Sequence, residues 1–161
     1  MSIINTLAGL FWAVFCCPEI YCGGAVCVQI NRKAALEELP TIIAAAERNN
    51  CRGDDFLILL AIRKAENGKP GREFGVLHPK ALQQIDAEPK QSLDIQAGWA
   101  AATIVKNRLC WRNCIGADCD FINFLGNRYC PASADAEGNK NWKRNVRYWF
   151  EKFKNPGIAG N

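Results

Sequence analysis

The chain has 161 residues, of which 49% are hydrophobic and 22% are charged, and its formal net charge is +4. This composition excludes a disordered chain and is typical of one domain that buries about two-thirds of its unfolded surface. The small positive charge attracts anions without selecting among them. Since the sequence has no zinc finger, glycine-rich phosphate loop or aromatic RNA-binding motif, nucleic acid is not expected as a partner.

Residues 1–30 are an apolar, cysteine-rich N-terminal segment, and residues 31–161 are expected to form the main domain. Apolar side chains recur at helical spacing in Ile3–Val14. This run is shorter than the roughly 20 apolar residues that span a bilayer. Three interpretations remain: packing against the domain or against another protein such as a virion or tail component, contact with a membrane surface, and an unprocessed export signal.

Nine cysteines are many for this length, and an odd number leaves at least one unpaired. They can be disulfides in an oxidising setting, reduced and buried side chains, or metal ligands. Because His78 is the only histidine, a zinc site would need almost only thiolates, and we expect no metal and no cofactor. The cysteines form an early group, a late group and one residue between them: Cys16, Cys17, Cys22 and Cys27; Cys110, Cys114, Cys119 and Cys130; and Cys51.

Helical periodicity dominates the rest of the chain, and strand signals are scarce. The first helix of the domain is predicted over residues 40–48, with Pro40 in its first turn. The next is predicted to begin with Asp54 or Asp55 as its cap and to end before Asn67.

A third helix is predicted over residues 93–109, with Ser92 as its cap, and a short segment over 120–125 follows it. The last helix, over about 141–154, carries an aromatic stripe that we interpret as core, with its basic face in solvent. The apolar sides of these two helices are predicted to be Ile95, Trp99, Ala102 and Val105, and Trp142, Val146, Trp149 and Phe153. The fold class is therefore predicted to be all-α, with at most a small irregular hairpin.

Glu66 is the strongest candidate for chemistry because it ends a predicted helix just before a glycine-rich turn. The helix dipole disfavours negative charge at that end, and the apolar residues after the turn desolvate it, so its pKa should rise. A glycosidic oxygen leaves readily only when it is protonated, which such an acid can do near neutral pH. Two alternatives stay open: Glu66 is an ordinary solvated glutamate, or Arg63 pairs with it and lowers its pKa.

The region around Glu66 resembles the superfamily of lytic transglycosylases and goose-type lysozymes. In that family a helix ends on the catalytic glutamate, and a Gly-containing turn of the form Met-Gly-Leu-Met-Gln runs towards a proline. The matching pieces here are Glu66-Asn67-Gly68 and Phe74-Gly75-Val76-Leu77-His78-Pro79, in which Asn67 replaces a serine and His78 a glutamine. The spacing of the two pieces agrees with the family pattern.

The resemblance continues downstream and covers about residues 54–131. Asp94-Ile95-Gln96-Ala97-Gly98 is similar to the family's helix that begins with Asn-Ile-x-x-Gly. Tyr129 is the candidate for the tyrosine that the family supplies to its site, although the surrounding Asn-Arg-Tyr-Cys-Pro departs from the family motif. The resemblance therefore implies a compact lysozyme-like helical domain.

The resemblance also implies an activity, which is cleavage of the β-1,4 bond between N-acetylmuramic acid and N-acetylglucosamine in peptidoglycan. Glu66 would be catalytic, and the substrate-binding residues would be Phe74, Gly75, Val76, Leu77 and Tyr129. Glu73 is the nearest second carboxylate for a hydrolytic route, with a solvated turn residue as the plainer alternative. The implied location is a phage virion or the bacterial cell envelope. A structural virion or tail component that keeps the fold without activity is the competing hypothesis.

Overall fold

The computed structural model describes residues 25–114 and 120–155, and within them the chain is all-α, without a strand. The helices are α2 (Ala25–Arg48), α3 (Asp54–Glu66), α4 (Pro79–Ala87), the 3-10 helix η1 (Pro89–Gln91), α5 (Ser92–Asn113), α6 (Phe121–Tyr129) and α7 (Ala136–Lys154). The predicted fold class is confirmed. The predictions for Ile3–Val14 and for Cys16, Cys17, Cys22 and Cys119 concern residues outside the described part.

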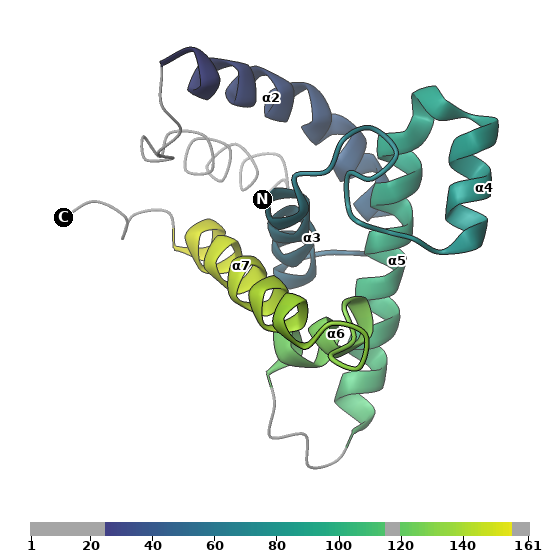
Figure 1. The fold of residues 1–161 in the computed structure, drawn as a ribbon, viewed down its shortest axis with the longest axis vertical. Helices are drawn as coiled ribbons and strands as arrows, with labels where there is room; N and C mark the ends of the chain where they lie inside the picture. Colours follow the sequence, from purple (N-terminus) through teal and green to yellow (C-terminus); the bar gives the residue numbers. More distant parts are fainter. Residues whose placement is uncertain (1–24, 115–119, 156–161) are drawn as a thin grey trace, which may run out of the picture.

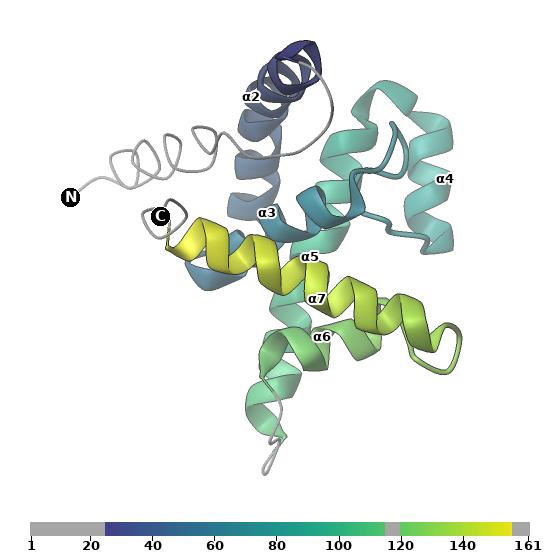
Figure 2. The same ribbon diagram turned by 60° about the vertical axis from the view of Figure 1, so that its left-hand side comes forward.

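Helix α3 is the centre of the arrangement, with α7 packed along one side and α5 on another (Figure 1). Helix α2 packs against α5, and α4 lies beside the first half of α5. Helix α6 lies against the second half of α5 and against α7, which crosses the molecule in the turned view of Figure 2. Helix α3 is thus covered by α7 and α5, and its last residue, Glu66, is partly buried.

Helix α2 differs from the helix predicted over residues 40–48. It begins at Ala25, so Pro40 lies in its interior rather than in its first turn, and the domain boundary expected at residue 30 falls inside it. A proline in a helix removes one backbone hydrogen bond and crowds the preceding turn. Pro40 is on the exposed side of α2, where water can satisfy the carbonyl that loses its partner.

Helix α3 ends where the sequence predicts, but its cap is different. Gly53 occupies the N-cap position, and Asp54 and Asp55 lie in the first turn, where the helix dipole stabilises their charge. Asp55 also accepts two hydrogen bonds from Arg108 of α5, at 2.5 and 2.8 Å. At the other end Asn67 adopts a left-handed conformation, with φ of 44°, and terminates the helix directly after Glu66.

The buried side of α5 is offset from the predicted one. Trp99 is only partly buried and Ala102 is exposed, while Gln91 rather than Ser92 is the N-cap. Small side chains allow neighbouring helices to approach closely, so Ala97, Ala100 and Ala101 face inward. The buried residues of α5 are Ser92, Gln96, Ala97, Ala100, Ala101 and Ile104.

Helix α4 was not predicted, and it is short. Pro79 occupies its first turn, and His78 is its N-cap in an extended conformation, with a ring nitrogen that accepts from the Lys80 backbone N–H. The His78 ring stacks on Trp99 at 4.7 Å between centroids. The His78 ring therefore contributes to the packing of α4 on α5.

Helices α6 and α7 form a tight pair in which a buried asparagine closes the end of α6. Asn139 of α7 donates from its amide to the carbonyl oxygens of Gly126 and Cys130, at 3.1 and 2.6 Å. A Cβ at Gly126 would lie 2.6 Å from the Lys143 Cγ, so the Lys143 side chain would have to move if residue 126 were larger. The predicted stripe on α7 is largely confirmed: its buried residues are Asn139, Trp142, Val146, Phe150 and Phe153, with Trp149 partly buried.

The four cysteines with described side chains are free thiols, and the described residues contain no disulfide. Cys51 is buried, and burial raises the pKa of its thiol to about 12. Within residues 25–114 and 120–155, no cluster of three or more His, Cys, Asp or Glu side chains is placed to hold a metal ion. None of the helices in these ranges is long and apolar enough to cross a membrane.

Candidate active site

The Glu66 carboxyl group lies at the end of α3 and against α7, which is distant in sequence. It ends α3 and is partly buried, and its Oε1 accepts a hydrogen bond of 2.9 Å from Nε1 of Trp142 on α7. Burial raises the pKa of Glu66 above its ordinary value, and the hydrogen bond from Trp142 lowers that pKa in part. The raised pKa agrees with the prediction from the sequence. Desolvation by burial has a larger effect on this pKa than the hydrogen bond from Trp142.

Gly75 is in direct contact with this carboxyl group. A Cβ built on Gly75 would lie 2.7 Å from Oε2 of Glu66 and 2.8 Å from its Cδ, so the carboxyl group would have to move if another residue stood here. Gly75 also has φ of 66°, a left-handed conformation that glycine adopts readily. Glycine therefore suits this position in two ways: it adopts the backbone conformation, and it leaves room for the Glu66 carboxyl group.

Gln96 of α5 holds the turn that contains Gly75. Its side chain is fully buried, and its Oε1 accepts from the backbone N–H groups of Phe74 and Val76, at 3.2 and 3.1 Å. Its Nε2 donates to the carbonyl oxygens of Val76 and Gly71, at 2.9 and 3.2 Å. One side chain thus provides hydrogen-bond partners for four backbone groups. These groups belong to an irregular segment and have no partners in a strand or helix.

Tyr129 reaches the same region from the end of α6. Its hydroxyl donates to the Phe74 carbonyl oxygen at 2.6 Å, and its ring stacks on Trp142 at 5.1 Å between centroids. Burial and, to a smaller extent, the negative charge of Glu66 raise the pKa of Tyr129, so its hydroxyl stays a donor. The structure therefore brings together Glu66, Gly75 and Tyr129, the residues whose proximity the family resemblance implied.

Arg63 does not pair with Glu66. The alternative in which this pairing lowers the pKa of Glu66 is therefore wrong. Its guanidinium binds both carboxylate oxygens of Glu38 on α2, at 2.7 and 2.9 Å, and also donates to the Glu73 carbonyl oxygen at 3.4 Å. This geometry joins α2, α3 and the turn. Since the positive charge of Arg63 is committed to Glu38, it does not stabilise an ionised Glu66 as a paired counter-ion.

Glu73 is placed in the interior and not on a solvated turn. Its side chain is 4% exposed, and its Oε1 accepts a hydrogen bond of 2.5 Å from Ser92 at the start of α5. The role of second carboxylate requires a group that faces a cleft and can hold a water beside the sugar. A buried side chain that points towards Ser92 lacks that exposure, so both the solvated interpretation and the second-carboxylate interpretation are corrected.

The other predicted binding residues divide into buried and exposed positions. Phe74 is fully buried and Val76 is 9% exposed, so their side chains belong to the core and only their backbone borders the turn. Their expected role in contacting sugar with side chains is therefore corrected. Leu77 is 62% exposed and remains available to a ligand.

Sequence reasoning missed Trp142 and Gln96 as parts of the site. Trp142 fits the apolar stripe of α7, and the available signal was that a buried indole N–H needs an acceptor. Gln96 is a buried amide in a helix whose other buried residues are mostly small and apolar. A polar side chain at such a position needs partners from an irregular segment nearby.

No protein-family model, curated protein or solved structure matches this chain.

Proposed function

We propose that this chain cleaves the β-1,4 bond between N-acetylmuramic acid and N-acetylglucosamine in peptidoglycan, with Glu66 as general acid. The observation that carries the proposal is the Glu66 carboxyl group itself, which is partly buried, held by Trp142 and packed directly on Gly75. Burial raises the pKa of Glu66, which keeps a proton available at a higher pH than for a solvated glutamate. The family resemblance supports peptidoglycan as the substrate, in a phage virion or the bacterial cell envelope.

In the first step Glu66 donates its proton to the oxygen that links the two sugars, while the bond from that oxygen to C1 of N-acetylmuramic acid breaks. The N-acetylglucosamine end leaves with the transferred proton as a hydroxyl group, and positive charge develops at C1. The Glu66 carboxylate formed in this step lies beside the leaving oxygen. It is then able to act as a base.

We further propose that Glu66 acts alone. Its carboxylate removes the proton from the 6-hydroxyl of N-acetylmuramic acid, whose oxygen attacks C1 and closes an anhydro ring, and Glu66 is protonated again. The burial of Glu73 against Ser92 supports this route over hydrolysis, because hydrolysis with two carboxylates needs the second one to orient a water.

The test compares the wild type with Glu66→Gln and Glu73→Gln on purified cell walls. Glutamine at position 66 keeps an oxygen for the Trp142 N–H but cannot give a proton, so clearing should be lost. Glu73→Gln controls for the loss of a second carboxylate near the same turn, and it should clear walls at a rate set by its stability alone. Mass spectrometry of the fragments should then find anhydro ends.

Equal clearing by the wild type and Glu66→Gln would contradict the catalytic role of Glu66. Hydrated sugar ends would contradict the single-glutamate route but not the glycosidase. Absence of clearing by the wild type would favour the competing hypothesis, a structural virion or tail component that keeps the fold without activity.

A further inference from the structure

Helix α7 carries a net positive charge, whereas the net charge of the rest of the chain is zero. Residues 136–154 contain six Lys or Arg and two Glu, a net charge of +4. The whole chain has 20 basic and 16 acidic residues, so the other residues contain 14 of each and are neutral in sum. The net positive charge of the protein is therefore concentrated on one helix, where it acts locally on an anionic ligand.

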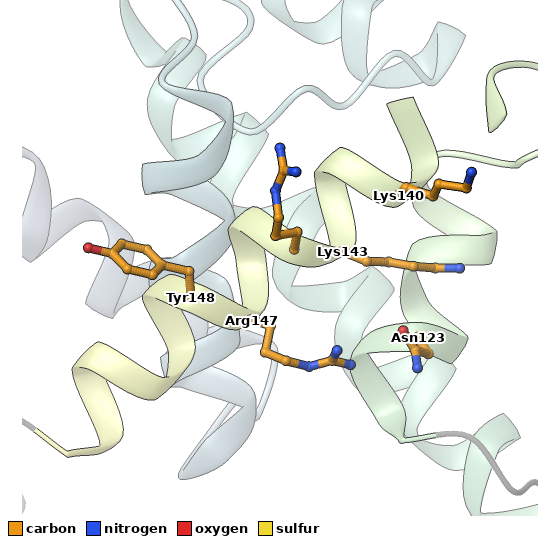
Figure 3. A pocket seen from close by; sticks show the side chains of 6 residues that line it. Asn123, Lys140, Lys143, Arg147 and Tyr148 are labelled. Carbon is orange, nitrogen blue, oxygen red and sulfur yellow. The ribbon is translucent and has the colours of Figure 1, made fainter. Parts of the chain in front are cut away.

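Part of this charge surrounds a hollow of about 480 Å³ between α6 and α7. Its lining residues are Asn123, Lys140, Lys143, Arg144, Arg147 and Tyr148. Figure 3 shows Lys143 and Arg147 extending from α7 on the side of Asn123. The volume lies in the range of small-ligand sites, and Glu66 is not among the residues that line it.

Two of the four cations in the hollow are balanced by carboxylates at its edges. Arg147 pairs with Asp120 at 2.7 Å, and Lys140 lies 3.8 Å from Glu137. The polar partners of Lys143 and Arg144 are instead the neutral amide oxygens of Asn127 and Asn141, both at 2.7 Å. The hollow thus offers about two uncompensated positive charges, which matches one or two phosphate groups.

We propose that this hollow binds the phosphodiester groups of an anionic polyol-phosphate polymer attached to the cell wall, and this inference rests on the proposed function. Lys143 and Arg144 supply charge-assisted hydrogen bonds to phosphate oxygens, and the half-exposed Tyr148 ring borders the hollow as an apolar surface for the polyol carbons. Binding here would hold the enzyme on its insoluble substrate while Glu66 acts elsewhere on the same molecule.

Acidic residues at the edges limit the hollow to a short stretch of a phosphate polymer. A nucleic acid presents successive phosphates, and proteins follow them with a continuous basic track. Asp120 and Glu137 interrupt such a track around the hollow. The hollow therefore accommodates one or two phosphate groups, and the wall location that the proposed function implies favours a polyol phosphate of the wall over a nucleic acid.

The test measures binding of the full chain to purified walls that carry a polyglycerol-phosphate polymer, in a Glu66→Gln background that leaves the walls intact. Adding Lys143→Gln and Arg144→Gln should weaken binding about tenfold for each lost charge-assisted contact. A matched control, Lys106→Gln with Arg112→Gln, removes two exposed cations of α5 and should bind like its Glu66→Gln parent. Walls stripped of the polymer by hydrofluoric acid should bind the parent as weakly as untreated walls bind the double variant.

Equal binding by the double variant, or equal binding to stripped walls, would overturn the inference, provided that thermal unfolding finds the variants folded. Tighter binding to a DNA fragment of equal phosphate content than to polyglycerol phosphate would also overturn it. Because binding is measured without cleavage, the two proposals can fail separately. A wild type that clears no walls, with binding still dependent on Lys143 and Arg144, would contradict only the proposed function.

Discussion

Replacing Gly75 with alanine perturbs the contact on which the candidate site depends. Two costs follow from the structure. The first is the backbone conformation, since φ of 66° costs a residue with a Cβ roughly 1–2 kcal/mol. The second is the clash between the new Cβ and the Glu66 carboxyl group, whose Oε2 would be 2.7 Å away. The carboxyl group must move, and a displacement of about 1 Å at a reacting centre can cost about 100-fold in rate.

Gly71→Ala is the matched control for the backbone cost. Gly71 has φ of 86°, but a Cβ there would meet only the Ile85 Cγ2 at 3.6 Å, an ordinary contact. Both variants should lose about 1–2 kcal/mol from this conformation, or about 2–8 °C in Tm for a chain of this size. Only Gly75→Ala should also lose wall clearing by about 100-fold. The reasoning is refuted if Gly75→Ala clears walls as fast as Gly71→Ala at equal fractions of folded protein.

Three further changes test the surroundings of the carboxyl group. Trp142→Phe removes the hydrogen bond that lowers the pKa of Glu66, so the alkaline limb of the pH profile for wall clearing should move to higher pH; a limb that moves to lower pH would contradict this. Gln96→Leu leaves the buried N–H groups of Phe74 and Val76 without their acceptor, and urea unfolding should find a loss of about 2–6 kcal/mol; a loss below about 1 kcal/mol would count against its role. Between the ordinary pKa of 4.5 and the raised pKa of Glu66, the folded state keeps a proton that the unfolded state has released, so this group's contribution to stability falls as the pH rises through that window. Glu66→Gln should remove this slope in urea unfolding at a series of pH values, and a difference between the two proteins that is independent of pH would refute the burial argument.

The parts of the fold that follow from local physics could be predicted from the sequence. The end of α3 was predicted because Asn67 tolerates the left-handed conformation that stops a helix. The all-α class followed from helical periodicity. The face of α5 was predicted wrongly because large apolar residues suggested the core, whereas the close approach of α2 and α3 selected alanines. Pro40 was misplaced because a proline on an exposed side of a helix is tolerated when tertiary packing outweighs its local cost.

The residues of the candidate site likewise divide into those that local sequence indicates and those that only the folded chain brings together. Glu66 was identified from its place at a helix end, and the glycine turn was connected with it through the family resemblance. The hydrogen bond from Trp142 joins residues 76 positions apart, and no local pattern encodes which carboxylate a buried indole will meet. Gln96 is likewise identified only when the turn folds over α5 and presents four backbone groups to one amide.

The rate at which Glu66→Gln releases soluble glycan fragments from purified cell walls, relative to the wild type, tests the central claim most directly. A positioned general acid contributes about 10²- to 10⁴-fold to a rate, so the variant should be slower by at least about 100-fold while it remains folded. Release within a few-fold of the wild-type rate would contradict the assignment of Glu66 as the general acid.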